Sequence, residues 1–426
     1  MVRGRTLGVG ACAAGLLLSG LAPVARAAPA IPRSAVTTAA HSGLPGPVPG
    51  CPPQHGTAAP DLAPWPQQEL GFAQVWNRTK GAGVTVAVVD SGVDANPQFG
   101  SRVIAGPDLV AGTKRGIPAG ADCVGHGTAV ASIIAAAPVK GVTFTGVAPA
   151  ARILSVKISG TDTFPTTVTA EGIMDAVQFG ADVINLSLSS PDDIPALRHA
   201  VAYALSHNVV VVAAAGNDLP QQGTGPFYPA AYPGVLSVGA AGPGGVLASF
   251  SDQRTPVAVV APGVNVTSAY PGTFPDAYAP DQNGTSFAAA YASGVVALVR
   301  AAYPRLTPAE VVARIEATAR GSTGPGTGHG MVDPVRAVTA VLAGEPGGQA
   351  SASAGTRVGA SAGTRASASA GKRAGAARAT ASDSAVTRAA IAGTFGLMVV
   401  IAVTAGLAVA RRRRSGERPR SGRHAA

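Results

Sequence analysis

The feature that most constrains the fold of this chain is a series of short, uninterrupted apolar runs separated by longer helical stretches. The six runs occupy residues 83–90, 151–158, 181–188, 208–216, 235–241 and 257–263. Helical stretches are expected at residues 126–137, 167–180, 194–207 and 286–303. Apolar runs without polar alternation are typical of strands that are buried on both faces of a parallel sheet. The pattern therefore predicts an α/β fold with a doubly wound, mostly parallel sheet flanked by helices.

Four polar residues lie at the ends of these predicted elements. Asp90 ends the first strand, and Asn217 directly follows the fourth. His126 and Ser286 each open a predicted helix. Because active sites of doubly wound sheets gather at the carboxyl ends of the strands, we expect these four side chains to converge at one edge of the sheet.

Each of the four also has an ordinary structural explanation. Ser286 is of a type that caps helices, and Asp90 is of a type that stabilises turns. Taken together, however, they supply what nucleophilic attack on a carbonyl requires. A serine hydroxyl needs a base, histidine is the usual base near neutral pH, and a buried carboxylate holds the imidazole in one tautomer. An amide side chain and the N–H groups at a helix start can stabilise the oxyanion.

The blocks "VAVVDSGVD", "GHGTAVAS", "AAAGN" and "NGTSFAAA" occur in this order within residues 70–343. This stretch resembles the subtilisin-like serine proteases, and its Asp, His, Ser order is that of subtilisin. The resemblance implies that residues 70–343 form the peptidase domain. It also implies that Asp90, His126 and Ser286 are the catalytic triad, with Asn217 in the oxyanion hole.

The same resemblance implies two substrate-binding segments. They are Ser187, Leu188 and Ser189, which pair with the substrate backbone, and Ala214, Ala215 and Gly216, on the opposite wall of the pocket for the residue before the cleaved bond. Two positions depart from the family pattern. Ala290 replaces the usual Pro four residues after the serine, and we expect the fold to tolerate it because Ala suits a helix. Ser189 replaces a frequent Gly, and we expect it to narrow the pocket.

The two ends of the chain indicate export and membrane anchoring. Residues 1–27 have two early arginines, an apolar stretch and a terminal "ARA", which predict a signal peptide. An uncleaved anchor is less favoured because the stretch is short and rich in Gly and Ala. Residues 389–410 are 22 uncharged residues, long enough for a transmembrane helix. The arginines that follow predict a cytoplasmic tail at 411–426, with the catalytic domain outside the cytoplasm.

The charge of the chain is concentrated in these ends. The net charge is +10, but residues 28–344 carry sixteen basic and nineteen acidic residues. No basic helix interrupts them, so we do not expect nucleic-acid binding. Residues 344–388 consist mainly of Ala, Ser, Gly and Thr with scattered Arg, which predicts a low-complexity linker. Frequent Gly disfavours the alternative, an Ala-rich helix.

Two cysteines, Cys51 and Cys123, remain after the signal peptide. In an exported chain an even pair usually forms a disulfide, which we therefore predict. Two thiols without neighbouring His or acidic ligands do not complete a zinc site, so we expect no metal there. No oxygen-ligand cluster predicts calcium, and we expect no cofactor.

The flanking segments resemble those of the mycosins, which are membrane-anchored subtilases associated with type VII secretion in actinobacteria. The shared features are the signal peptide, a Pro-rich extension at 28–69 bearing Cys51, an extra Cys before His126, and the C-terminal membrane helix. The resemblance implies an extension that packs on the peptidase domain, whereas a cleaved inhibitory propeptide is less favoured. It also implies a serine endopeptidase that acts on a protein or peptide substrate through an acyl-enzyme, with the membrane and a type VII secretion complex as partners. The alternatives are a structural subunit in which proteolysis is dispensable, and a free-standing surface protease.

Overall fold

The computed structural model describes residues 51, 56–110, 120–161, 163–218, 224–271, 276–321 and 323–343. The predicted signal peptide, the linker, the transmembrane helix and the cytoplasmic tail lie outside these residues. The segment boundaries predicted from the sequence therefore remain predictions. The description that follows concerns the body of the chain, which carries the peptidase blocks.

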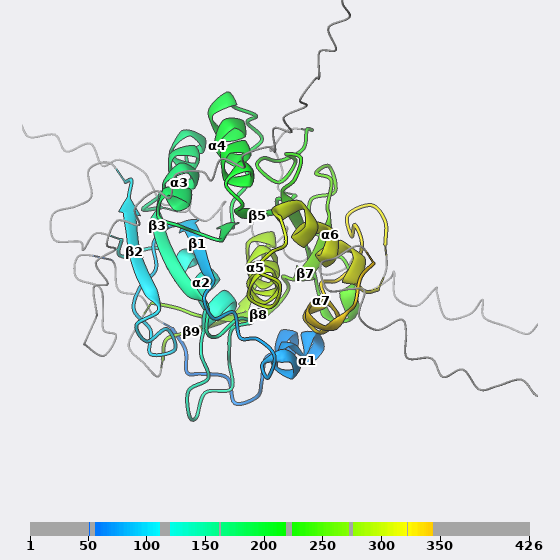
Figure 1. Cartoon of the computed structure of the whole chain (residues 1–426). Helices are drawn as coiled ribbons and strands as arrows, with labels where there is room; N and C mark the ends of the chain where they lie inside the picture. Colours follow the sequence, from blue (N-terminus) through cyan, green and yellow to red (C-terminus); the bar gives the residue numbers. More distant parts are fainter. Residues whose placement is uncertain are drawn as a thin grey trace, which may run out of the picture. The chain divides into compact units, whose positions relative to one another are not determined.

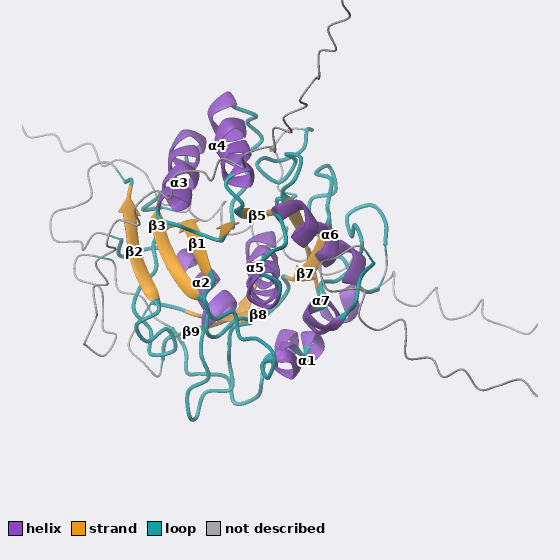
Figure 2. Ribbon diagram, viewed as in Figure 1, coloured by secondary structure: helices purple, strands orange, loops and turns teal. Residues whose placement is uncertain are grey.

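A parallel sheet of seven strands forms the centre of this body (Figures 1 and 2). In spatial order the strands are β2 (Val103–Asp108), β3 (Arg152–Lys157), β1 (Thr85–Asp90), β4 (Val183–Leu186), β5 (Val210–Ala214), β6 (Leu236–Ala241) and β7 (Val259–Pro262). The order changes direction at β1: the chain continues through β2 and β3 on one side of β1, and then crosses to β4 on its other side. The predicted α/β fold with a parallel sheet is confirmed.

Helices cover both faces of the sheet because the central strands are apolar on both sides. In β1, Val86 and Val88 belong to the core that contains α2 (His126–Ala135) and α5 (Thr285–Ala302). Ala87 and Val89 belong to the other core, with α3 (Thr166–Gln178) and α4 (Pro195–Ser206). Figure 1 shows α3 and α4 together on one side of the sheet and α2 and α5 on the other. This two-sided burial explains the uninterrupted apolar runs in the sequence.

Helix α5 runs through the middle of its layer. Among the described helices it is the one that is long and apolar enough to span a bilayer, but 83% of its most apolar window is buried inside the protein. A Cβ atom added to Gly294 would lie 2.6 Å from Val147, so the helix packs closely on its neighbour there. Its apolar composition is therefore that of a core helix, and Ala290 is fully buried within it.

Several elements are not marked by apolar runs in the sequence. Strand β2 has the sequence VIAGPD and lies at the edge of the sheet. Its Gly106 and Pro107 interrupt the apolar run that would otherwise predict a strand. The short antiparallel pair of β8 (Val266–Ala269) and β9 (Tyr278–Gln282) was also not expected. Helices α1 (Trp65–Leu70), α6 (Pro308–Thr318) and α7 (Pro334–Thr339) and the 3₁₀ turns η1 (Phe72–Val75) and η2 (Pro243–Gly245) complete the described body.

The N-terminal extension packs on the body through side chains and backbone. Cys51 forms the predicted disulfide with Cys123, with their Cα atoms 5.0 Å apart. Thr57 exchanges two backbone hydrogen bonds with Tyr278 of β9, at 2.7 and 3.1 Å. The indole of Trp65 donates to the carbonyl of Val264 at 3.0 Å. These contacts agree with an extension that lies against the catalytic body.

Candidate active site

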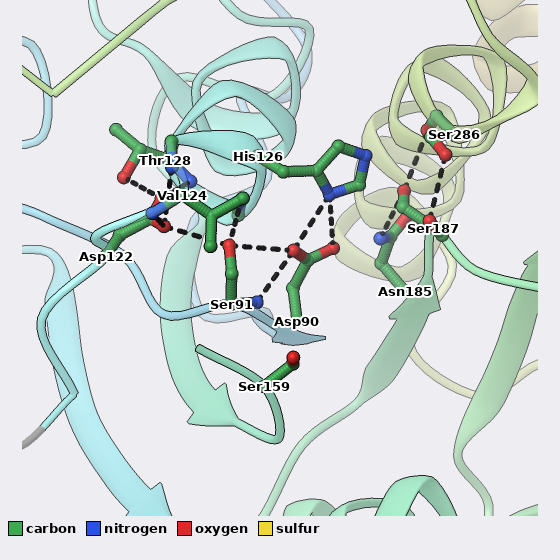
Figure 3. A network of polar contacts seen from close by, with 12 residues as sticks. Asp90, Ser91, Asp122, Val124, His126, Thr128, Ser159, Asn185, Ser187 and Ser286 are labelled. Atoms are coloured by element: carbon green, nitrogen blue, oxygen red, sulfur yellow. Dashed lines mark hydrogen bonds and ion pairs between the residues drawn. The ribbon is translucent and has the colours of Figure 1, made fainter. Parts of the chain in front are cut away.

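Asp90 and His126 are brought together by β1 and α2. Asp90 is the last residue of the central strand and is completely buried, and His126 is the first residue of α2. The imidazole Nδ1 lies 2.8 Å from Asp90 Oδ1 and 3.0 Å from Oδ2 (Figure 3). The ring is flanked by Phe164 and Phe287, with centroids 6.0 and 5.9 Å away. The carboxylate thus fixes Nδ1 as the protonated nitrogen, which leaves Nε2 as the basic one.

A second buried carboxylate, Asp122, holds the loop that carries His126. It accepts hydrogen bonds from the N–H groups of Val124, Gly125 and Thr128 at 3.1, 2.7 and 2.8 Å. The hydroxyl of Ser91 donates to it at 2.8 Å, which connects it to the residue after Asp90. Burial raises the pKa of Asp122, and the hydrogen bonds from Thr128, Gly125 and Ser91 oppose that rise.

Asp94 in turn holds Asp122 and Thr128 in place. Its Oδ1 accepts from the N–H of Asp122 at 3.0 Å, and its own N–H donates to Thr128 Oγ1 at 3.0 Å. Its Oδ2 is buried and has no hydrogen-bond partner among the described residues. Burial is the main cause that raises the pKa of Asp94 to about 7, and the negative charge of Asp122 adds to it.

Ser286 lies in the first turn of α5. The N-cap residue is Gly284, and no side chain caps the helix, so the helix-capping explanation of Ser286 does not apply. Its hydroxyl instead donates to the backbone carbonyl of Ser187 at 2.9 Å (Figure 3). A hydroxyl has one proton, so transfer of that proton to His126 requires a rotation of the Ser286 side chain. Phe287, the next residue, already contacts the His126 ring.

A buried chain of side-chain hydrogen bonds connects β4 to α5 behind Ser286. Ser293 Oγ donates to Asn185 Oδ1 at 2.9 Å, and Asn185 Nδ2 donates to Ser187 Oγ at 2.9 Å. Ser187 Oγ in turn donates to the carbonyl of Ser286 at 2.7 Å. Asn185, Ser187 and Ser293 are all at most 2% exposed. Both the carbonyl and the hydroxyl of Ser286 are therefore hydrogen-bonded to Ser187, which fixes the first turn of α5 to the end of β4.

Asn217 follows β5 and contacts the start of α5. Its Oδ1 accepts from both the N–H and the hydroxyl of Thr285, each at 3.0 Å. Because both bonds use the oxygen, the Nδ2 amide group is directed away from Thr285 and is left as a donor. Asn217 also pairs with Ser251 in an antiparallel bridge, which fixes its backbone.

The two predicted substrate segments leave the sheet from neighbouring strands. Leu186 of β4 pairs with Ala213 of β5, so the residues that follow each strand start side by side. Their exposure differs along the two segments: Ser187 and Leu188 are 2% and 7% exposed, Ser189 is exposed, and Ala214, Ala215 and Gly216 are buried. Ser187, at the start of the first segment, and Asn217, directly after the second, both contact the first turn of α5.

An aspartate–histidine pair, a serine at a helix start and an oriented asparagine on a parallel α/β sheet define the serine peptidases of the subtilisin class. The profile of the Subtilase family matches residues 81–390, and the chain belongs to that family. It is a subtilisin-like serine endopeptidase.

Its relatives include mycosins. Mycosin-1 of Mycobacterium tuberculosis is 35% identical over 354 residues, which cover 69% of this chain and 76% of the relative. The crystal structure of MycP1 from the ESX-1 type VII secretion system is 31% identical with a TM-score of 0.59, and the match covers 71% of this chain and 91% of that one. A chain in the periplasmic assembly from the ESX-5 inner membrane complex is 29% identical with a TM-score of 0.59, covering 71% and 92%. The recognition of a mycosin-type subtilase is thus confirmed.

Sequence reasoning did not find the residues that support the four polar groups. Ser91, Asp122 and Thr128 lie one to four residues from Asp90 or His126, and Thr285 precedes Ser286. Their proximity in the blocks was a usable signal, but their hydrogen-bond partners are set by tertiary contacts.

Proposed function

We propose that the chain is a membrane-anchored, extracytoplasmic endopeptidase in which Asp90, His126 and Ser286 form the catalytic triad. The observation that carries the proposal is the Asp90–His126 pair at 2.8 and 3.0 Å, with the α5 start that bears Ser286 next to the same imidazole. Hydrolysis of a peptide bond by this set proceeds through an acyl-enzyme.

His126 Nε2 takes the proton of Ser286 as the hydroxyl attacks the substrate carbonyl. The resulting imidazolium is stabilised by Asp90, whose buried carboxylate contacts Nδ1 with both oxygens. His126 then gives the proton to the leaving amine. A water molecule repeats the sequence on the acyl group, with His126 again as the base, and the serine is restored.

The oxyanion is stabilised by the Asn217 Nδ2 group and by the N–H of Ser286. The first N–H groups of an α-helix have no partner within the helix and carry a partial positive charge, which suits a developing oxyanion. Thr285 supports the Asn217 orientation, because its two donors occupy the amide oxygen.

The substrate backbone is proposed to lie between the Ser187–Ser189 and Ala214–Gly216 segments. This is supported by the position of both segments at the carboxyl ends of β4 and β5, directly beside α5. An extended peptide that pairs with such segments brings its carbonyl over the helix start.

Labelling with a serine-directed fluorophosphonate tests the catalytic proposal. The folded full-length chain is expected to be labelled at Ser286, and Ser286→Ala is expected to be unlabelled and inactive. His126→Ala is expected to lose labelling as well, because the base is gone. Absence of labelling in the folded wild-type chain would overturn the proposed chemistry.

The proposed anchoring rests on residues 389–410 and the arginines after them. Removal of residues 389–426 is expected to move the protein from the membrane fraction to the soluble extracytoplasmic fraction. External protease is expected to reach the body but not the tail of the intact protein. Retention of the truncated chain in the membrane fraction would contradict this anchor.

We also propose a role in type VII secretion. The alternative to a proteolytic role there is that of a structural subunit, for which proteolysis is dispensable. The supporting observation is the similarity to a chain in the periplasmic assembly from the ESX-5 inner membrane complex. Complementation separates the two roles. If a Ser286→Ala chain restores secretion in a deletion strain, the structural role dominates, whereas failure of that variant shows that proteolysis is required.

A further inference from the structure

Another part of the chain connects the C-terminal ends of the two proposed substrate segments. Ser187, which begins the first segment, and Asn217, which directly follows the second, both contact the first turn of α5. Ser190, directly after the first segment, exchanges two backbone hydrogen bonds with Tyr228, at 2.9 and 2.8 Å. The residue before Tyr228 is Phe227, which lies against the other segment. Residues 227 and 228 therefore cross from one wall to the other.

The Phe227 ring packs directly on Gly216. A Cβ atom added to Gly216 would lie 2.6 Å from Cδ2 and 2.9 Å from Cγ of this ring. Gly216 also has a φ of +103°, so two independent reasons require glycine here. Gly216 immediately precedes Asn217, so the ring lies against the second segment next to the proposed oxyanion donor. Phe227 is 1% exposed.

The ring is held firmly in this position. The guanidinium of Arg254 lies over it, 5.2 Å from the ring centroid, and Arg254 Nε contacts the buried Asp252 at 2.5 Å. The N–H of Phe227 donates to Thr255 Oγ1 at 2.9 Å. The N–H of Asp252 donates to the carbonyl of Gly216 at 3.0 Å, which ties the same loop to the wall. A substrate side chain cannot displace the ring without breaking these contacts.

We infer that Phe227 determines the size of the residue accepted before the cleaved bond, and that the enzyme selects Gly and Ala there. This inference rests on the proposed function, because it needs Ser286 as the nucleophile and the two segments as the pocket walls. In this arrangement the phenyl ring forms the floor of the pocket. It occupies the volume that the substrate's Leu or Phe side chain would need beyond its β-carbon. One surplus methylene in a filled pocket typically reduces kcat/KM by about 10-fold or more.

The test uses peptide amides of one sequence that differ only in the residue before a fluorogenic leaving group: Ala, Leu or Phe. The purified full-length chain is expected to cleave the Ala substrate with a kcat/KM at least about 10-fold higher than the Phe substrate. Phe227→Ala is expected to raise the Phe-to-Ala ratio by about 10-fold or more, and Phe227→Leu by less. The matched control is Phe99→Ala, which truncates an equally buried ring just before β2, an edge strand that is separated from β4 by β3 and β1. It is expected to leave the ratio unchanged.

All rates are divided by the fraction of chain labelled by the fluorophosphonate. Labelled wild-type protein that cleaves Leu or Phe as readily as Ala would overturn the inference while leaving the proposed function intact. An unchanged ratio in labelled Phe227→Ala or Phe227→Leu would do the same. Failure of the wild type to be labelled would overturn both the inference about Phe227 and the proposed function. If neither Phe227 variant folds, the wild-type substrate profile decides by itself.

Discussion

At the scale of single residues, the site depends on the side chains that hold the reacting groups as much as on those groups. Asn217 is oriented because Thr285 donates twice to its oxygen. His126 is positioned by Asp90 directly and by Asp122 through the loop backbone. Each support is buried, so water cannot replace a lost bond easily, and the effect of removing it is correspondingly large.

Thr285→Val keeps the shape of the side chain and the backbone N–H bond but removes the hydroxyl bond to Asn217. We expect kcat to fall about 3–10-fold with a smaller change in KM, compared with about 100-fold or more for Asn217→Ala. A double-mutant cycle tests whether Thr285 acts on kcat through Asn217. In the Asn217→Ala background Thr285→Val is expected to change kcat little, and a full additive loss would show that Thr285 acts independently of the amide.

Asp94→Asn is expected to change the pH dependence of stability. Because the pKa of Asp94 is raised to about 7 from 3.8, the folded state binds its proton more tightly than the unfolded state. This group therefore contributes less stability as pH rises from about 4 to about 7. The variant is expected to unfold in urea with a free energy about 4 kcal/mol higher than the wild type at pH 8 and about equal at pH 4. A difference that does not vary with pH would contradict this origin.

At the scale of elements, the proposed site is a junction between strand ends and helix starts. Asp90 ends β1, Asn217 lies three residues after β5, and His126 and Ser286 lie in the first turns of α2 and α5. Each helix start is fixed to a strand by buried hydrogen bonds. For α5 the connection runs through Ser187 to β4.

Ser187→Ala removes the side-chain connection between β4 and the first turn of α5. It leaves the buried amide of Asn185 without its partner, so we expect the free energy of unfolding to fall by about 1–3 kcal/mol. We also expect kcat to fall several-fold, since the Ser286 peptide unit loses a contact. Ser293→Ala breaks the far end of the same chain of bonds and serves as the control. It is expected to reduce stability similarly with a smaller loss of kcat, and equal losses of kcat would argue against a positioning role for Ser187.

At the scale of the whole molecule, the extension is attached to the catalytic body at several distant points. The disulfide joins Cys51 to Cys123, three residues before His126. Further along, Thr57 pairs with β9 and Trp65 donates to the segment between β7 and β8. The extension therefore bridges the loop of α2 and the small antiparallel sheet.

Removal of the disulfide is expected to destabilise the protein mainly through the unfolded chain. The bond spans a separation of 72 residues, for which loop-closure entropy predicts a loss of about 4 kcal/mol. The single variants Cys51→Ser and Cys123→Ser and the reduced wild type are expected to lose the same amount in urea unfolding. A substantially larger loss in Cys123→Ser than in the reduced wild type would show that packing at that position, rather than the cross-link, is responsible.

Much of the fold was accessible from the sequence because its signals are local. Uninterrupted runs of Val, Ile and Ala predicted six of the seven strands of the main sheet, and helix α6 carries a Thr307–Glu310 capping box that could have been found. Strand β2 was missed because Gly106 and Pro107 remove the apolar pattern that an internal strand would show. Predicted ends of elements were shifted by a few residues, as for α2, which ends at Ala135 because Ala136 is extended.

The sequence by itself determined the fold class and the four polar residues, because strand and helix ends are encoded within short blocks and the carboxyl edge of a parallel sheet collects them. Only the tertiary structure decided which atoms meet. The Ser286 hydroxyl turns to the Ser187 carbonyl instead of capping its helix, and Asp122 supports the His126 loop. Phe227 packs on Gly216, which precedes it by eleven residues. These contacts depend on side-chain orientations and loop paths, and their geometry is set by how the whole core packs.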